Sequence, residues 1–176
     1  MHIMDILQNS IRAEATMISL VIEEDTKENM LSMVITDNGK GMNPEELSRA
    51  TDPFFTTRTT RKVGLGLSLL HQNALRTGGT FCLESSPGKG TTVTSRFRPD
   101  HPDMLPFGDL AGAFLLPVMS NPSVSFTYFH RKNDQQYSFS TEEVRAALGG
   151  ISLESPELYG PLHGMISENL KDISVS

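Results

Sequence analysis

Apolar residues recur along the chain with two different periods, one typical of helices and one typical of strands. At residues 3–13 they repeat every three or four positions, as on one face of an amphipathic helix. At residues 17–24 and 30–37 they alternate with polar residues, as in half-buried strands. For the first hundred residues this pattern predicts helices over 3–13, 44–49 and 64–76, and strands over 17–24, 30–37, 80–85 and 91–98.

Several of these elements have sequence signals at their ends. Asn43 can cap the short helix over 44–49, and Pro44 suits its first position. The helix over 64–76 is expected to end at Gly78 and Gly79, and the last two strands pair across the turn 86–90. The order helix, strand pair, helix, strand pair predicts an α+β fold. We expect a two-layer sandwich with a mostly antiparallel sheet and helices on one face.

A second region is expected after a proline-rich linker. Three prolines between residues 99 and 106 mark the linker, so we divide the chain into residues 1–99 and a small α+β unit over 100–176. Thr141 is expected to cap one helix of this unit, and Pro161 to break or delay another. The predicted elements are helices near 109–119, 141–148 and 156–171, and strands over 123–130 and 135–140.

The charge of the chain is unevenly placed. Residues 1–99 are neutral overall, and residues 100–176 carry the whole net charge of −6. A negative balance counts against a nucleic-acid partner, which needs clustered positive charge. The longest apolar stretches are too short to span a membrane, and residues 1–10 do not resemble a signal peptide. The chain has a single cysteine, Cys82, which we expect to be buried on its strand. One cysteine cannot form an internal disulfide, so a cytoplasmic protein is predicted.

One interval of the neutral half is basic. From Pro53 to Leu83 the sequence contains Arg58, Arg61, Lys62 and Arg76 and no acidic residue. A local positive field next to glycine-rich backbone favours a small polyanionic ligand, although a solvated basic loop has the same composition.

Four short segments carry residues suited to binding such a ligand. Asp5 and Asn9 lie one helical turn apart and present oxygen ligands for a divalent cation and a water molecule. Asp37 ends a strand and is followed by two glycines, so its carboxylate can accept a hydrogen bond from an exocyclic amine. Glycines at 64 and 66 open a helix whose free N–H groups favour phosphate, and the fourth segment is the turn 88–92.

Together these segments resemble the boxes of the GHKL superfamily, the Bergerat-fold ATPases that include sensor histidine kinases, gyrase and anti-sigma-factor serine kinases. Residues 5–13 resemble the N-box, 37–42 the first glycine box and 52–57 the F-box of histidine kinases. Residues 64–70 are similar to their G-L-G-L-S box, and 88–92 to the last glycine box. The resemblance covers residues 1–98.

The resemblance implies a binding site for ATP and Mg²⁺. Asn9 would bind the magnesium ion, Asp37 would accept from the adenine amino group, and Asp5 would act as the catalytic base. Gly39 and Gly41 would line the base pocket, with a hydroxyl from Thr91 or Thr92. Phe54 and Phe55 would pack at the root of a lid, whose tip is residues 58–63. The nucleotide-binding residues expected in all are Asn9, Asp37, Gly39, Gly41, Met42, Phe54, Phe55, Arg58, Arg61, Lys62, Gly64, Leu65, Gly66, Leu67, Thr91 and Thr92.

The sequence departs from the family pattern in two places. Asp5 stands where these ATPases carry Glu, which shortens the reach of the base by about 1.5 Å and predicts slow hydrolysis. The histidine kinases present their phosphoacceptor on a helical hairpin ahead of the N-box, and none of the five histidines here is expected to replace it. We therefore expect a protein kinase or slow ATPase with its phosphoacceptor on another chain. A nucleotide-gated interaction module and an inactive ATPase fold stay open as alternatives, as does the oligomeric state.

Overall fold

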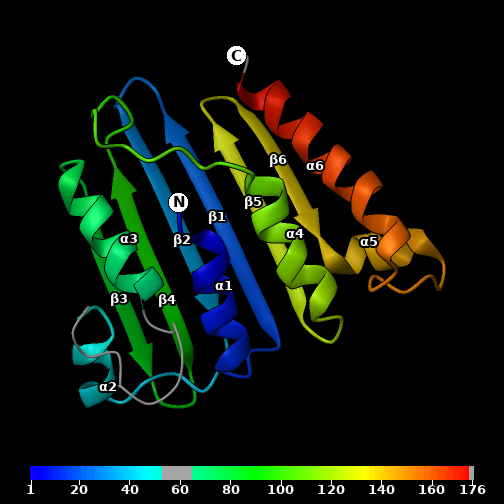
Figure 1. Ribbon diagram of the computed structural model, residues 1–176, viewed down its shortest axis with the longest axis horizontal. Helices are drawn as coiled ribbons and strands as arrows, with labels where there is room; N and C mark the ends of the chain where they lie inside the picture. The colour runs from blue at the N-terminus through cyan, green and yellow to red at the C-terminus, as the bar shows by residue number, and fades with distance from the viewer. Residues whose placement is uncertain (53–64, 175–176) are drawn as a thin grey trace.

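The computed structural model describes residues 1–52 and 65–174, which form one six-stranded sheet with helices packed on it (Figure 1). The strand order is β3-β4-β2-β1-β5-β6, and within the described residues every strand pair is antiparallel except β1–β5. The strands are β1 (Met17–Asp25), β2 (Met30–Asp37), β3 (Thr80–Ser86), β4 (Gly90–Phe97), β5 (Ser125–Lys132) and β6 (Gln135–Ser140).

The helices cover one face of this sheet. Figure 1 shows α1, α3 and α4 lying across the same side, and α6 packs against α4, β5 and β6. They are α1 (Ile3–Arg12), α2 (Pro44–Arg49), α3 (Leu65–Arg76), α4 (Leu110–Ser120), α5 (Thr141–Leu148) and α6 (Tyr159–Ser174), with a 3₁₀ turn η1 over Pro156–Leu158. The predicted α+β class, with a mostly antiparallel sheet under one layer of helices, is confirmed.

The core lies between the helices and the sheet. Side chains alternate along each strand, so every second one points to the face that the helices cover. Leu20 of β1 is paired with Ile35 of β2 on one side and with Tyr128 of β5 on the other, and all three are buried. Phe114 of α4 packs its ring on Tyr128, with 5.1 Å between the ring centroids. The apolar core is therefore continuous from β2 to β5, across the boundary expected at residue 99.

Three details of the sequence prediction differ from the structure. Ser140, not Thr141, is the cap residue of α5, because the Thr141 hydroxyl instead accepts a hydrogen bond from the Phe126 N–H at 3.0 Å. The last helix begins at Tyr159, so that Pro161 lies in its first turn, where a missing N–H costs nothing. Cys82 is exposed, since β3 is an edge strand and this side chain is on the face without helices.

None of the helices in the described part of the chain is long and apolar enough to cross a membrane. The cytoplasmic location stays a prediction.

Candidate functional site

A cavity of about 300 Å³ opens between α1, α3 and the strands β2 and β4. Its walls are mainly apolar, and its polar groups are concentrated on α1 and on the loop that follows β2. The residues that line it are Ile6, Asn9, Ser10, Arg12, Ala13, Asp37, Lys40, Gly41, Met42, Ala50, Leu67, Thr91 and Val93. An apolar slot with few polar groups is the usual form of a small-molecule site.

Asp37 is the buried acidic group of this cavity, with 7% of its surface exposed. Its Oδ2 accepts a hydrogen bond from the Ser10 hydroxyl at 2.6 Å, and its Oδ1 accepts one from the Gly39 N–H at 2.9 Å. Both bonds fix the orientation of the carboxylate, and each oxygen keeps a second lone pair. The site can therefore accept a hydrogen bond from an amino group on a flat, largely apolar ligand.

The loop after β2 is held to the sheet at both ends. The Asn38 Oδ1 accepts from the backbone N–H groups of Thr16 and Met17, both at 2.9 Å, and its Nδ2 donates to the Thr16 hydroxyl. Further along, the Met42 N–H donates to the Ser85 hydroxyl at 2.9 Å. These bonds preorganise the cavity wall, because the loop is tied to β1 and to the β3–β4 hairpin without any ligand.

Two glycines of this loop are required by packing. Gly41 has a φ of +67°, and a Cβ on it would lie 1.9 Å from the carbonyl oxygen of Ser86. A Cβ on Gly39 would lie 2.6 Å from the carbonyl oxygen of Ala13, at the end of α1. Gly41 lines the cavity, whereas the Cβ position of Gly39 faces α1.

The two polar residues predicted on α1 lie in different surroundings. Asn9 lines the cavity, and its Oδ1 accepts a hydrogen bond from the Arg12 guanidinium at 3.2 Å. The Asp5 side chain is 59% exposed and does not line the cavity, and its carboxylate lies 3.4 Å from Nδ1 of His2. The predicted base, Asp5, and the predicted metal ligand, Asn9, thus lie on adjacent turns of α1, and of the two only Asn9 is at the cavity wall.

The start of α3 approaches α1 closely. A Cβ on Gly66 would lie 2.7 Å from the Cβ of Asp5, so a larger residue at 66 would push the helices apart. Leu67 lines the cavity, while Leu65 is exposed. The first residues of α3 therefore stand next to Asp5, at the α1 end of the site.

The structure separates the two candidate threonines of β4. Thr91 is paired with Asp37 across β2 and β4 and lines the cavity, where its hydroxyl is 2.8 Å from that of Ser85. The Thr92 hydroxyl instead donates to Thr36 at 3.4 Å on the opposite face of the sheet. Six predicted site residues lie outside the described residues, namely Phe54, Phe55, Arg58, Arg61, Lys62 and Gly64.

Sequence reasoning missed several residues of the cavity. Ser10 is the partner of Asp37, and its signal was a polar residue on the buried face of α1, in register with Ile3, Ile6 and Leu7. Arg12 and Lys40 add two positive side chains to the lining. Within residues 1–52 and 65–174, there is no group of three or more His, Cys, Asp or Glu side chains that could hold a metal ion.

The segment of the chain that forms this cavity matches the model of a known protein family. The model of the family described as histidine kinase-, DNA gyrase B-, and HSP90-like ATPase matches residues 2–101, more than half of the chain. The matched segment contains α1, β1, β2, α3 and the β3–β4 hairpin, and every residue that lines the cavity lies within it.

Several curated relatives that share this segment are named as sensor proteins. The chain is 37% identical over 93 residues to a putative sensor protein of Shewanella frigidimarina, and 36% identical over 97 residues to the sensor protein kinase FleS of Pseudomonas aeruginosa. Each match covers 52% of this chain, but only 14% and 23% of the two relatives. The sensor histidine kinase ZraS of Escherichia coli is 40% identical over 60 residues, which are 34% of this chain and 13% of that protein.

A solved structure shares the fold over a longer range. The N-terminal domain of a DNA repair protein superposes with a TM-score of 0.56 and 18% identity, covering 80% of this chain and 51% of the other. At that identity the likeness concerns the fold alone, and it covers a larger share of the chain than the family match does.

Proposed function

We propose, from the premise that the chain belongs to the histidine kinase-, DNA gyrase B- and HSP90-like ATPase family, that it transfers the γ-phosphate of ATP to a protein or releases it slowly to water. The family match makes residues 2–101 a histidine-kinase-like ATP-binding domain. The chain spans less than a quarter of the relatives compared above, so the reaction itself is proposed on the geometry of the cavity.

The observation that carries the proposal is the buried carboxylate of Asp37 in an apolar cavity. The two hydrogen bonds from Ser10 and Gly39 leave it oriented as an acceptor for the adenine amino group. A guanine base presents a carbonyl oxygen at the same position, which the carboxylate would repel. The site is therefore expected to prefer ATP over GTP, because a buried polar group without a partner is costly.

The phosphates would extend from the base toward α1 and the start of α3. Asn9, Arg12 and Lys40 line the cavity and can contact a triphosphate and its magnesium ion. We assign Asn9 to the ion, since its Oδ1 is a hard oxygen ligand that Arg12 holds at the cavity wall. A magnesium ion held there would supply the charge neutralisation on which phosphoryl transfer depends.

Asp5 is our candidate for the group that positions the attacking water or hydroxyl. Its Cβ packs against Gly66, beside the first N–H groups of α3, where the terminal phosphate is expected. Its carboxylate is exposed and therefore reachable from outside the cavity. An incoming acceptor side chain could approach it there.

The phosphoacceptor is proposed to lie outside these 176 residues. Of the histidines in the described part of the chain, His71 stacks on Phe81 at 4.8 Å between ring centroids. His130 is buried between Tyr128 and Glu24, and His163 is paired with Asp109. These contacts give the three residues packing roles, and His2 and His101 are paired with Asp5 and Asp103, so we expect a partner protein or a further segment to supply the acceptor.

One observation favours a second candidate function, a nucleotide-gated interaction module. The Asp5 carboxylate is 59% exposed and does not line the cavity, and it is one methylene shorter than Glu. An ATPase with a poorly placed base would bind nucleotide without turning it over. In that case ATP would change which partner the protein binds, and no phosphate would be transferred.

Binding and turnover can be separated with one variant. Thermal unfolding is first measured with ATP, ADP and GTP, each with magnesium, and ATP at 100-fold over Kd should stabilise the protein by about 2.7 kcal/mol. Phosphate release is then compared for the unmutated protein and for Asp5→Asn, with Asp134→Asn on the remote β5–β6 turn as the matched control.

We expect Asp5→Asn to lose turnover and keep the thermal shift, while Asp134→Asn keeps both. Turnover by Asp5→Asn at the unmutated rate would remove the proposed base. A shift with no phosphate release from any form, with or without candidate partner proteins, would support the module instead. No shift with any nucleotide would show an inactive ATPase fold.

A further inference from the structure

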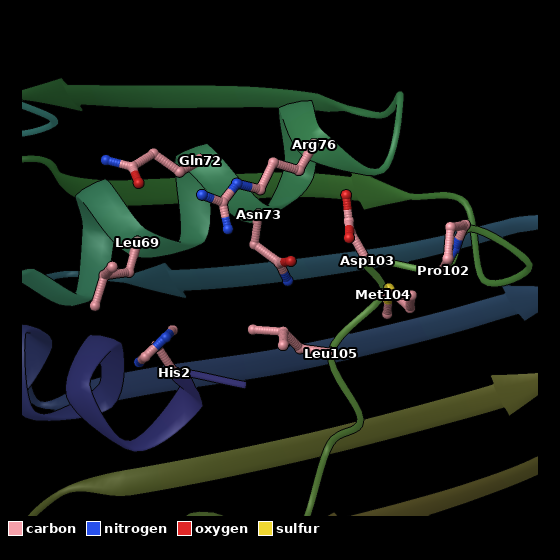
Figure 2. A pocket seen from close by; sticks show the side chains of 9 residues that line it. All are labelled: His2, Leu69, Gln72, Asn73, Arg76, Pro102, Asp103, Met104 and Leu105. Atoms are coloured by element: carbon pink, nitrogen blue, oxygen red, sulfur yellow. The ribbon is translucent and has the colours of Figure 1, made fainter.

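A second cavity of about 300 Å³ lies between α3, the start of α1 and residues 102–105 (Figure 2). It shares no lining residue with the cavity around Asp37, although α3 contributes to both and His2 directly precedes α1. Its lining residues are His2, Leu69, Gln72, Asn73, Arg76, Pro102, Asp103, Met104 and Leu105. Nothing in the ATPase proposal uses this cavity.

Asn73 is the polar group at its centre. The residue is 5% exposed, and its Nδ2 has no hydrogen-bond partner among the residues that the structure describes. Figure 2 shows its side chain extending from α3 into the space between Arg76, Asp103 and Leu105. Buried amide groups in native proteins are nearly always paired. The Nδ2 atom is itself closed to solvent, so a ligand's acceptor would reach this unpaired donor after a small rotation of the amide toward the cavity.

Two opposite charges flank this amide. Arg76 approaches from α3, and Asp103 approaches from the segment after β4 (Figure 2). A simple anion would be repelled by Asp103, and a simple cation by Arg76. A small molecule that carries one charge of each sign matches both, with its anionic end toward Arg76 and the Asn73 amide.

The remaining surface of the cavity suits an aliphatic group. Leu69 and Leu105 are 37% and 41% exposed, and Met104 lies beside Leu105 in the same wall. Covering such side chains with an alkyl group removes apolar surface from water. The size and form of the cavity fit a compact metabolite better than a protein segment.

We propose that this cavity binds a free α-amino acid with an aliphatic side chain. The carboxylate accepts hydrogen bonds from the Asn73 amide and the Arg76 guanidinium, and the ammonium group donates to the Asp103 carboxylate. The alkyl side chain packs on Leu69 and Leu105. The assignment is independent of the proposed ATPase function, because the two sites share no lining residue.

The test is a titration of the full chain with L-leucine, followed by calorimetry and by chemical shifts of the amide groups of α3. Two analogues each remove one charge, namely leucinamide, which lacks the carboxylate, and 4-methylpentanoate, which lacks the amine. We expect saturable binding of leucine and at least about tenfold weaker binding of each analogue, the effect of one lost charge-assisted hydrogen bond.

Two variants locate the binding. Asn73→Leu removes the unpartnered amide at similar volume, and Asn169→Leu makes the same change at a half-buried position of α6 that does not line the cavity. The first should weaken leucine binding at least about tenfold while leaving the unfolding temperature equal or higher, because no donor is left buried. In Asp103→Asn the affinity for 4-methylpentanoate should come close to the affinity for leucine, because the amine no longer has a carboxylate partner. The remote Asp134→Asn should leave the difference between the two ligands unchanged.

The proposal would be overturned if leucine produced no saturable change, or if Asn73→Leu bound it as tightly as the unmutated protein. Equal affinity for leucine and leucinamide would also exclude it, since the anchored carboxylate is its central claim. The thermal shift with Mg-ATP is measured on every variant and is expected to be unchanged. A loss of leucine binding can thus be distinguished from a failure of the ATP site.

Discussion

Replacing Asp37 by Asn tests the recognition of the base most directly. The side chain is almost isosteric, and its surroundings tolerate the change. Oδ1 can still accept from the Gly39 N–H, and the Ser10 hydroxyl can rotate so that it accepts from the new amide. The fold should lose about 1 kcal/mol of stability, the difference between a charge-assisted and a neutral hydrogen bond.

The effect on nucleotide binding should be larger than the effect on the fold. In the variant an amide N–H₂ can replace the carboxylate oxygen that faces the adenine amino group, so that two donors meet. Loss of one charge-assisted hydrogen bond corresponds to about 1.5–3 kcal/mol, or roughly 10- to 150-fold in Kd. Because Asp37 is 7% exposed, solvent can replace the lost contact only poorly.

Adenosine separates the base contact from the phosphates. Without the negative charge of Asp37, the site attracts any polyanion a little more strongly, so the affinity for ATP alone would understate the loss of the base contact. Adenosine carries no charge and is free of this effect. Calorimetric titrations of both forms with adenosine, ATP and GTP should show adenosine and ATP weakened and the preference over GTP reduced. If the variant bound adenosine as tightly as the unmutated protein, Asp37 would not be the adenine acceptor.

Two further predictions concern the stability of the fold. Gly41→Ala should lower the free energy of unfolding in urea by more than about 2 kcal/mol, because φ is +67° and the new Cβ meets the Ser86 carbonyl; Gly88→Ala, with a φ of +74° and open space, should cost only about 1 kcal/mol, and equal losses would contradict this explanation. Hydrogen bonds from the Gly112 N–H and from His163 lower the pKa of Asp109, so its stabilising effect is complete above the unfolded pKa of about 3.9 and is lost as the pH falls further. The unfolding temperature of Asp109→Asn should therefore fall less than that of the unmutated protein between pH 5 and pH 2, and parallel curves would show that this carboxylate contributes nothing.

Most secondary structure could be predicted because local signals agree with the tertiary packing. The capping box of α2, in which Asn43 and Glu46 bond each other's backbone N–H, follows directly from the residue types. The cap of α5 could not be predicted in the same way. Thr141 has the right chemistry for a cap, but its hydroxyl bonds the N–H of Phe126, a contact that exists only once β5 is in place. Local patterns do not encode such a partner.

The arrangement of the strands was predictable only in part. Hairpins such as β1–β2 and β3–β4 join neighbours in sequence, and the turn residues between them indicate the pairing. The parallel contact between β1 and β5 joins segments more than a hundred residues apart, and nothing in either strand specifies it. The burial of Cys82 was predicted wrongly because the alternation of a strand does not tell which of its two faces the helices cover.

The candidate site divides along a similar line. Asp37, Asn9 and Gly41 lie in sequence motifs and line one cavity. Ser10 and Lys40 lie in the same motif segments, but the hydrogen bond from Ser10 to Asp37 and the place of Lys40 in the cavity wall depend on how α1 packs against the loop after β2. The role of Asp5 depends on the approach of α1 to α3, which the close contact at Gly66 allows.

The pairing of β1 with β5 also has a consequence during synthesis on the ribosome. Ile18 finds its neighbour Phe126 only after 108 further residues have been added, which takes about 5–20 s at about 5–20 residues per second. Throughout that time one edge of β1 is open to pairing with other nascent chains. Rapid translation of residues 100–132 would shorten this exposure, so slow codons there should lower the soluble yield more than slow codons after residue 140.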